Sequence, residues 1–297
     1  MSDAPGELRA PDCARIAYRR WRSPAARGAL VLLHGVASNL TRWSEFAART
    51  SLKDRWDILR PDLRGQGGSV WRGRIGMDEW CGDLAALLAQ EGRARAVLAG
   101  HCLGANLALE FAARQPAMAA GLVLIEPMPR QALAGTMRRV ARLRPLLLLL
   151  AAAVRAANAL GVHRRRLAAL DLEQLDRETR AALARGAEGE ALLARYASPL
   201  ADLRTTASGA YLQALAAVTQ PPPQPARIAA PVLALVSAQG SFTDAQAVRA
   251  YLGALPDCER IELPARHWIP TEQPEAMRAA IEAWIGRRFP AGTGPGC

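Results

Sequence analysis

The sequence lacks the features that mark several protein classes. Its longest apolar run, at residues 146–154, is too short to span a bilayer. The first ten residues contain acids and no apolar core of a secretory signal. The five cysteines are odd in number and far apart, which argues against a disulfide framework and for a reducing compartment. We therefore expect a cytoplasmic protein.

Two further absences concern ligands. The sequence has no zinc-finger spacing, RNA-recognition signature or basic heptad pattern, so we expect no nucleic-acid partner. No cluster of His, Cys, Asp and Glu residues has metal-ligand spacing, so we expect neither a metal nor a cofactor.

Lysine is almost missing, because Lys53 is the only one and arginine carries nearly all of the positive charge. The formal net charge is +11. An arginine-rich composition is typical of a GC-rich genome and equally of selection for anion binding. The second explanation predicts a small-molecule acyl substrate that is anionic or linked to CoA or a carrier, or peripheral contact with an acidic membrane surface.

Apolar sequence is abundant, and its pattern indicates the fold. The 297 residues are 51% hydrophobic and 22% charged, which predicts a sizeable buried core. Apolar runs typical of buried strands alternate with helical patterns from Arg15 to Pro127 and resume at Val232. Between them, residues 128–220 are rich in Ala, Leu and Arg and predict several helices. We expect an α/β fold with a mostly parallel, doubly wound sheet: a core of residues 1–127 and 221–297 with a helical insertion at 128–220.

The stretch LAGHCLGANLALE, at Leu98–Glu110, predicts a strand, a glycine-flanked turn and a helix. Small residues on both sides of Cys102 let the neighbouring backbone pass close to a sharp, strained turn. A side chain there stands clear of the sheet at the start of a helix, whose dipole and free N–H groups favour a thiolate. We expect Cys102 to be a nucleophile and the N–H of Leu103 to stabilise an oxyanion.

Two earlier loops fit the same site. The segment HGVASN, at residues 34–39, ends a buried strand and turns the chain so that the N–H of Val36 or Ala37 points at the reaction centre. The segment PDLRGQGGS, at residues 61–69, is its companion loop after the next strand. The loop residues that we expect to be structural rather than catalytic are His34, Asp62 and Arg64.

Taken together, HGVASN, PDLRGQGGS, GHCLGA, the helical block and the late histidine of RHWIPTEQPE resemble the α/β-hydrolase superfamily, in its capped branch. The resemblance covers nearly the whole chain outside residues 128–220. It implies that this insertion is a cap that selects the substrate. It also implies that His267, on the loop after the last strand, is the general base that takes the thiol proton and later activates water.

The acid that orients the imidazole has two candidates. In most of the superfamily it follows the seventh strand, but Gln239 and Gly240 stand there and cannot ionise. Asp244 lies a few residues on and matches a helix N-cap. Some capped hydrolases carry the acid at the end of the sixth strand, where this chain has Glu126. We favour Glu126 over Asp244; the alternative for Glu126 is that it only ties down the start of the cap.

A cysteine at the elbow is locally similar to dienelactone hydrolases and polyhydroxyalkanoate synthases. Dienelactone hydrolases lack a cap of this size, and the synthases are usually longer. The resemblance implies cleavage of a carboxylic ester, thioester or lactone through a thioester on Cys102. Two alternatives remain: an acyltransferase with the same three residues, and a non-catalytic ligand-binding protein on a hydrolase fold, against which the intact Cys–His pair counts.

The predicted cap contains a segment, residues 143–166, that is apolar in the middle and basic at both ends. We favour a buried helix whose arginine stems cover the rim. The alternative is an interfacial or acyl-binding lid whose arginines meet phosphate or carboxylate groups. The residues that we expect to line the substrate pocket are Trp43, His101, Tyr196, Tyr211 and Trp268.

Overall fold

The computed structural model describes residues 3–185, 194–240 and 242–290, and Cys297 lies outside these ranges. The described residues form an eight-stranded sheet with the order β1-β2-β4-β3-β5-β6-β7-β8. β2 pairs antiparallel with β1 and β4, and all other neighbouring strands are parallel. The predicted doubly wound, mostly parallel sheet is therefore confirmed. The strands are β1 (Ala4–Arg9), β2 (Arg15–Trp21), β3 (Ala29–Leu33), β4 (Asp57–Pro61), β5 (Ala96–His101), β6 (Ala119–Ile125), β7 (Val232–Ser237) and β8 (Cys258–Leu263).

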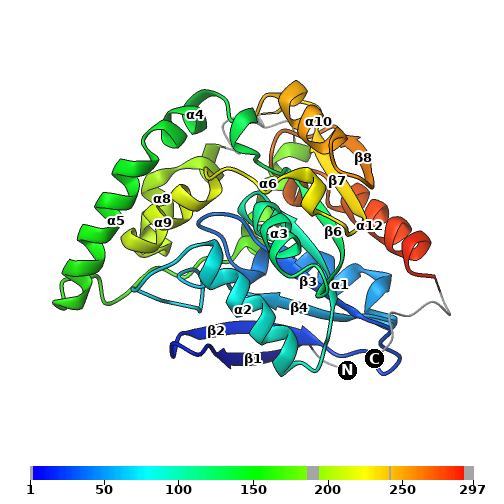
Figure 1. The fold of residues 1–297 in the computed structure, drawn as a ribbon, viewed down its shortest axis with the longest axis horizontal. Coiled ribbons are helices and arrows are strands. Elements are labelled where there is room, and N and C mark those ends of the chain that lie inside the picture. Colours follow the sequence, from blue (N-terminus) through cyan, green and yellow to red (C-terminus); the bar gives the residue numbers. More distant parts are fainter. Residues whose placement is uncertain (1–2, 186–193, 241, 291–297) are drawn as a thin grey trace.

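Helices cover both faces of the sheet (Figure 1). Along β3, Val31 and Leu33 belong to one buried cluster and Leu30 and Leu32 to another, because successive side chains of a strand point to opposite faces. The first cluster includes side chains of α2 (Met77–Gln90), α3 (Leu103–Arg114) and α10 (Ala245–Gly253). The second includes side chains of α1 (Ser44–Arg49) and α12 (Pro274–Arg288), and the short α11 (Ile269–Glu272) leads into α12.

The edge strand β1 was not expected from the sequence. It contains Pro5 and Gly6, and both residues are unfavourable inside a sheet. At the edge of a sheet this composition is tolerated, since a strand there pairs on one side only. β1 pairs antiparallel with β2 along its whole length and extends the sheet beyond the parallel core.

Five α-helices lie between β6 and β7 within the described residues. They gather on one side of the molecule, away from β1 (Figure 1). The predicted boundaries at residues 127 and 220 fall in the connections that lead from β6 into these helices and from them into β7. The helices are α4 (Gly135–Arg142), α5 (Arg144–Ala159), α6 (Leu172–Ala184), α8 (Pro199–Thr205) and α9 (Ser208–Val218).

The helix α5 corrects one expectation. We favoured a buried helix within residues 143–166, but Ala151 is the only residue of α5 that is buried. Its leucines face outward, with 47% of Leu146 and 66% of Leu149 exposed. One side of α5 packs against α9, and no described element covers the other side. None of the helices in the described ranges is long and apolar enough to cross a membrane.

Candidate active site

Cys102 lies at the sharp turn between β5 and α3. Its backbone has φ 56° and ψ −114°, a conformation that L-residues rarely adopt. The turn requires the two flanking glycines, because a Cβ at Gly100 would overlap the carbonyl oxygen of Gly104, and one at Gly104 would overlap that of Leu33. This strained and crowded geometry holds the thiol at the start of α3, at the wall of a cavity.

His267 lies on the loop after β8 and is only 4% exposed. Its Nδ1 is 3.2 Å from Oε2 of Glu126. Glu126 follows β6 directly, and its backbone is also strained, with φ 51°. The other carboxylate oxygen, Oε1, accepts a hydrogen bond of 2.5 Å from the N–H of Ser237 at the end of β7. The carboxylate is thus held between the ends of two neighbouring strands and faces the imidazole.

The electrostatics of His267 favour its charged form. Burial lowers its pKa, but hydrogen bonding to Cys102 and Glu126 and the negative charges of these groups raise the pKa of His267 to about 10. The imidazole therefore lies between the thiol of Cys102 on one side and the carboxylate of Glu126 on the other. This arrangement can accept the thiol proton and hold it.

Asp244, the second candidate acid, is engaged elsewhere. Its side chain accepts a hydrogen bond of 2.8 Å from the N–H of Ala247, which makes it the N-cap of α10. Its backbone N–H bonds to the carbonyl of Ala132. The structure thus brings Glu126, and not Asp244, to the imidazole.

Of the two predicted oxyanion donors, Val36 lies in the turn after β3 and Leu103 directly follows Cys102. Gly35, just before Val36, lies so close to the elbow that a Cβ there would be 3.4 Å from the Cβ of Cys102. Leu103 is the first residue of α3. Within the described ranges neither the N–H of Val36 nor that of Leu103 donates a hydrogen bond. Free N–H groups beside a nucleophile can bind the negative oxygen of a tetrahedral intermediate.

The other histidines near the site are held in neutral form. His101 donates from Nε2 to the carbonyl of His267 at 3.0 Å, and burial keeps the pKa of His101 well below its usual range. His34 accepts a hydrogen bond from the N–H of Leu63 at 2.9 Å and thereby joins two loops. Burial lowers the pKa of His34 to about 4.

The companion loop is held by its own side chains. Asp62 accepts hydrogen bonds from the N–H groups of Leu40 and Gly68, at 2.6 and 2.7 Å. Arg64 pairs with Asp83 at 2.5 Å. Both side chains therefore tie the loop to its surroundings, in the way the sequence predicted.

A cavity of about 790 Å³ lies between the core and the inserted helices, and Cys102 and His267 are in its wall. Four of the predicted pocket residues line it: His101, Tyr196, Tyr211 and Trp268. Trp43 does not. It is fully buried in the second cluster, edge-on to Phe46 at 5.9 Å, because the turn that carries it packs against α1 rather than facing the cavity.

The comparison with protein families agrees with the observed fold. The family model of the alpha/beta hydrolase fold matches residues 28–274. The chain belongs to the alpha/beta hydrolase fold family.

Solved structures and curated relatives resemble this α/β hydrolase. A hydrolase from Pseudomonas aeruginosa PA01 has a TM-score of 0.70 at 23% identity, covering 96% of this chain and 100% of that one. Lipase LipV of Mycobacterium tuberculosis is 33% identical over 104 residues, 35% of this chain and 39% of the lipase. The 2-(acetamidomethylene)succinate hydrolase of Mesorhizobium japonicum is 30% identical over 102 residues, 34% of this chain and 36% of that enzyme. The chain thus matches less than two fifths of the length of these curated relatives.

Sequence reasoning missed three residues of the site in this α/β hydrolase. Met128 lies against the thiol of Cys102, with its Sδ 3.3 Å from Sγ. Asn106 holds Met128 in place by bonding both its N–H and its carbonyl, at 2.9 and 3.0 Å. Phe242 packs edge-on to His267 at 4.8 Å. Asn106 follows Cys102 by one helical turn, and this spacing was the only signal for any of the three.

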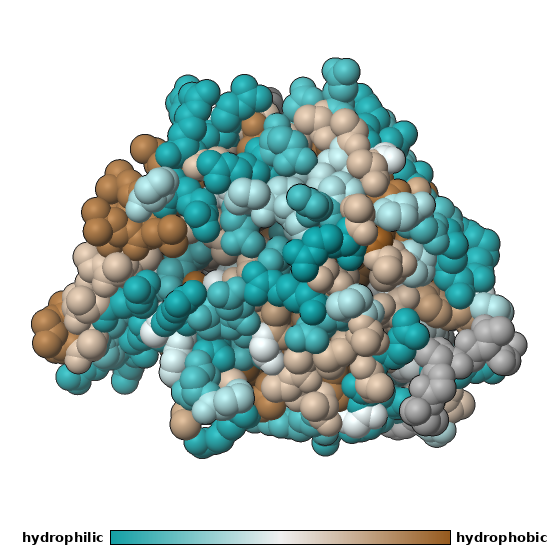
Figure 2. Space-filling model, viewed as in Figure 1, coloured by the Kyte–Doolittle hydropathy of each residue, from teal (hydrophilic) through white to brown (hydrophobic). Residues whose placement is uncertain are grey.

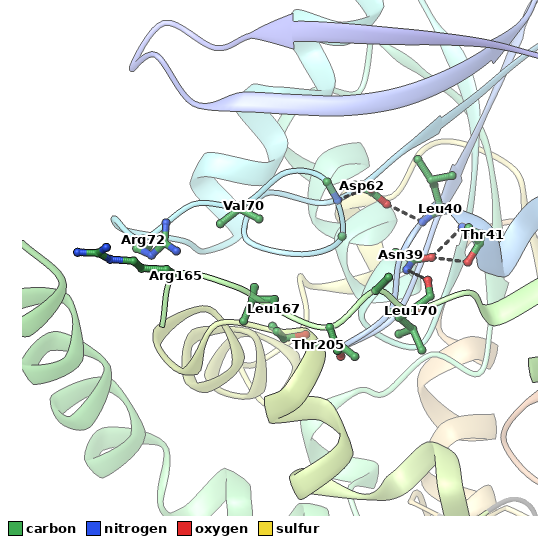
Figure 3. A pocket seen from close by; sticks show the side chains of 16 residues that line it. Asn39, Leu40, Thr41, Asp62, Val70, Arg72, Arg165, Leu167, Leu170 and Thr205 are labelled. Carbon is green, nitrogen blue, oxygen red and sulfur yellow. Dashed lines mark hydrogen bonds between the residues drawn. The ribbon is translucent and has the colours of Figure 1, made fainter. Parts of the chain in front are cut away.

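A second cavity, of about 460 Å³, opens between the loop at residues 67–72 and the segment at 165–170 (Figure 3). Arg72 and Arg165 lie at one end of it, and Asn39, Leu40 and Thr41 at the other (Figure 3). It shares three lining residues with the larger cavity: Ser38, Leu170 and Thr205. The described residues contain no cluster of three or more His, Cys, Asp and Glu that could hold a metal ion.

Proposed function

We propose that this α/β hydrolase cleaves a carboxylic ester, thioester or lactone, with Cys102 as nucleophile, His267 as base and Glu126 as the orienting acid. The observation that carries the proposal is the position of His267. It is buried between the thiol and a carboxylate 3.2 Å away, at the wall of a cavity large enough for a small substrate.

In the first half of the reaction, the thiol of Cys102 gives its proton to His267, and the sulfur attacks the substrate carbonyl carbon. The carbonyl oxygen becomes negative and accepts hydrogen bonds from the N–H groups of Val36 and Leu103. When the tetrahedral intermediate collapses, the bond to the leaving group breaks and His267 protonates that group. The acyl group then remains as a thioester on Cys102.

In the second half, His267 takes a proton from a water molecule, which attacks the thioester carbonyl. The carbon–sulfur bond breaks, and the sulfur recovers its proton from the imidazole. Glu126 stabilises the imidazolium in both halves and keeps Nδ1 protonated, so that Nε2 is free for the thiol and the water. The 2.5 Å bond from Ser237 keeps this carboxylate in position.

The lining of the larger cavity favours a substrate with an apolar acyl part. Its wall includes the apolar side chains of Met137, Val140, Leu215 and Val218. Two of the relatives are named as a lipase and as a 2-(acetamidomethylene)succinate hydrolase, and these names are consistent with an acyl substrate. A thiol nucleophile favours activated acyl groups, since thioesters and esters have better leaving groups than ordinary amides.

Intact-mass spectrometry after mixing with a p-nitrophenyl ester tests the proposal. We expect a transient acyl adduct on the wild-type chain and none on Cys102→Ala. Cys13→Ala is the matched control, because Cys13 is an exposed free thiol and its loss should leave the adduct unchanged. An adduct that persists in Cys102→Ala and disappears in Cys13→Ala would overturn the assignment. Tight binding of an unchanged acyl ligand, with no adduct from any donor, would indicate a binding protein instead.

Acyl transfer by the same three residues is the rival reaction, because a thioester exchanges readily with thiols and amines. Product analysis in the presence of an added thiol distinguishes the two reactions. Hydrolysis predicts the free acid as the main product at every thiol concentration that leaves the enzyme intact. Transfer predicts that the thiol ester replaces the acid as the concentration rises.

A further inference from the structure

The outer face of α5 is an exposed apolar surface. Leu146, Leu149 and Leu150 are 47%, 66% and 45% exposed, and their spacing of three and four residues places them on one side of the helix. Leu143, just before α5, is 54% exposed. Figure 2 shows hydrophobic surface gathered over α5. Apolar patches of this kind on a folded protein mark an interaction site.

The same part of the chain has a one-sided charge. Residues 128–170 contain nine arginines and no Asp or Glu. Arg139 and Arg142 lie before α5, and Arg165 and Arg166 lie after it, so positive charge flanks the leucines at both ends. These four side chains are exposed, and none of them has a carboxylate partner in the parts of the chain that the structure describes. We call the outer side of α4 and α5, with residues 164–166, the α4–α5 face.

We propose that the α4–α5 face docks onto an anionic lipid bilayer. The leucines would enter the boundary between headgroups and acyl chains, and the flanking arginines would bind lipid phosphates. The combination of exposed leucines with flanking arginines favours a lipid bilayer over other partners. A second copy of the chain would set two strongly positive faces against each other, and a nucleic acid would leave the leucines without an apolar partner.

The docked face lies one helix layer away from the candidate active site. The inner side of α5 packs against α9, and α9 supplies Tyr211, Leu215 and Val218 to the wall of the larger cavity. The helix α4 supplies Thr136, Met137 and Val140 to the same wall. Docking would therefore place the cavity next to a supply of acyl lipids. Only this last step depends on the proposed function, since the docking itself requires no catalysis.

Vesicle sedimentation of the full chain tests the docking. We expect the wild type to sediment with vesicles of phosphatidylcholine and phosphatidylglycerol, and far less with phosphatidylcholine alone, with binding that weakens as salt is added. Arg139→Gln/Arg142→Gln/Arg166→Gln should lower the partition coefficient roughly a hundredfold, since each arginine near an anionic surface contributes about a factor of five. Leu146→Gln/Leu149→Gln/Leu150→Gln should lower it at least about tenfold.

Arg95→Gln/Arg249→Gln/Arg260→Gln is the matched control, because it removes the same charge from exposed positions outside the α4–α5 face. We expect it to bind nearly as well as the wild type. An equal loss of vesicle binding in the two triple arginine variants would show non-specific attraction and overturn the proposal. Absence of binding to any vesicle would also overturn it. Hydrolysis of a soluble p-nitrophenyl ester and the thermal melting curve should stay unchanged in all variants. Their loss would bear on the fold or the proposed function, and not on the docking.

Discussion

The carboxylate of Glu126 lies 3.2 Å from Nδ1 of His267, although 141 positions separate the two residues in the chain. Glu126 ends β6 and His267 follows β8, and β7 lies between these strands. The carboxylate spans this gap because the N–H of Ser237, at the end of β7, holds its other oxygen. The ends of β6, β7 and β8 thus hold the carboxylate and the imidazole next to each other.

The first prediction separates the two candidate acids. Glu126→Gln should lower kcat roughly a hundredfold or more, because an amide neither stabilises the imidazolium nor fixes its tautomer. Asp244→Asn should leave kcat nearly unchanged, since asparagine also caps a helix. Steady-state kinetics on a p-nitrophenyl ester measures both. The reverse order of effects would refute the assignment of Glu126.

The second prediction concerns stability and pH. The pKa of His267 is raised from its ordinary 6.5 to about 10, so its contribution to folding is complete below about pH 6.5 and is lost as the pH rises towards 10. The difference in free energy of unfolding between the wild type and His267→Gln should therefore shrink over this interval. Urea unfolding at several pH values measures it. A difference that stays constant would show that the imidazole is not charged in the folded chain.

The third prediction concerns substrate binding. Asp202 is the only acid among the residues lining the larger cavity, and burial raises its pKa to about 6 against the opposing effect of a hydrogen bond from Tyr211. A charge therefore appears in this wall as the pH rises through about 6. For an uncharged apolar ester, KM should increase over that range in the wild type and stay flat in Asp202→Asn. If the two profiles have the same shape, Asp202 does not contact the bound substrate.

The fourth prediction tests the elbow. Gly104→Ala should destabilise the chain by about 3 kcal/mol or prevent its folding, because the new Cβ would overlap the carbonyl of Leu33. Gly82→Ala is the control, since Gly82 lies inside α2 and a methyl group there would have no other atom within 4 Å beyond its own turn of helix. It should stabilise the chain by about 0.5–1 kcal/mol. Thermal melting of both variants measures the contrast, and similar melting temperatures would contradict the crowded elbow.

The fifth prediction concerns the junction between the core and the inserted helices. Arg42 donates from Nη1 to Asp176 of α6 at 2.7 Å and to Thr271 at 2.6 Å, and the Arg42–Asp176 pair is almost fully buried. Asp176→Ala leaves a buried charge without its partner and should cost about 3–5 kcal/mol of unfolding free energy. The double variant Arg42→Met/Asp176→Leu should cost less. Urea unfolding measures the loss of unfolding free energy in each variant. A smaller loss in Asp176→Ala than in the double variant would contradict the buried ion pair.

Much of the site was predictable because its signals are local. Glycines on both sides of Cys102, between a strand pattern and a helix pattern, specify a sharp turn wherever they occur in this order. The order of the segments then placed His267 on the loop after the last strand. The choice between Glu126 and Asp244 needed the structure, since it depends on which carboxylate lies across β7 from an imidazole far away in the chain.

The sequence by itself determined the α/β class, the order of its motifs along the chain, the elbow at Cys102 and the loop roles of His34, Asp62 and Arg64, because these follow from periodicity and short-range geometry. Only the tertiary structure decided that Trp43 faces the core and that the leucines of α5 face outward. An apolar side chain is stabilised when other atoms cover it and remove it from water. Which neighbouring element covers it, if any, is decided by how distant segments pack.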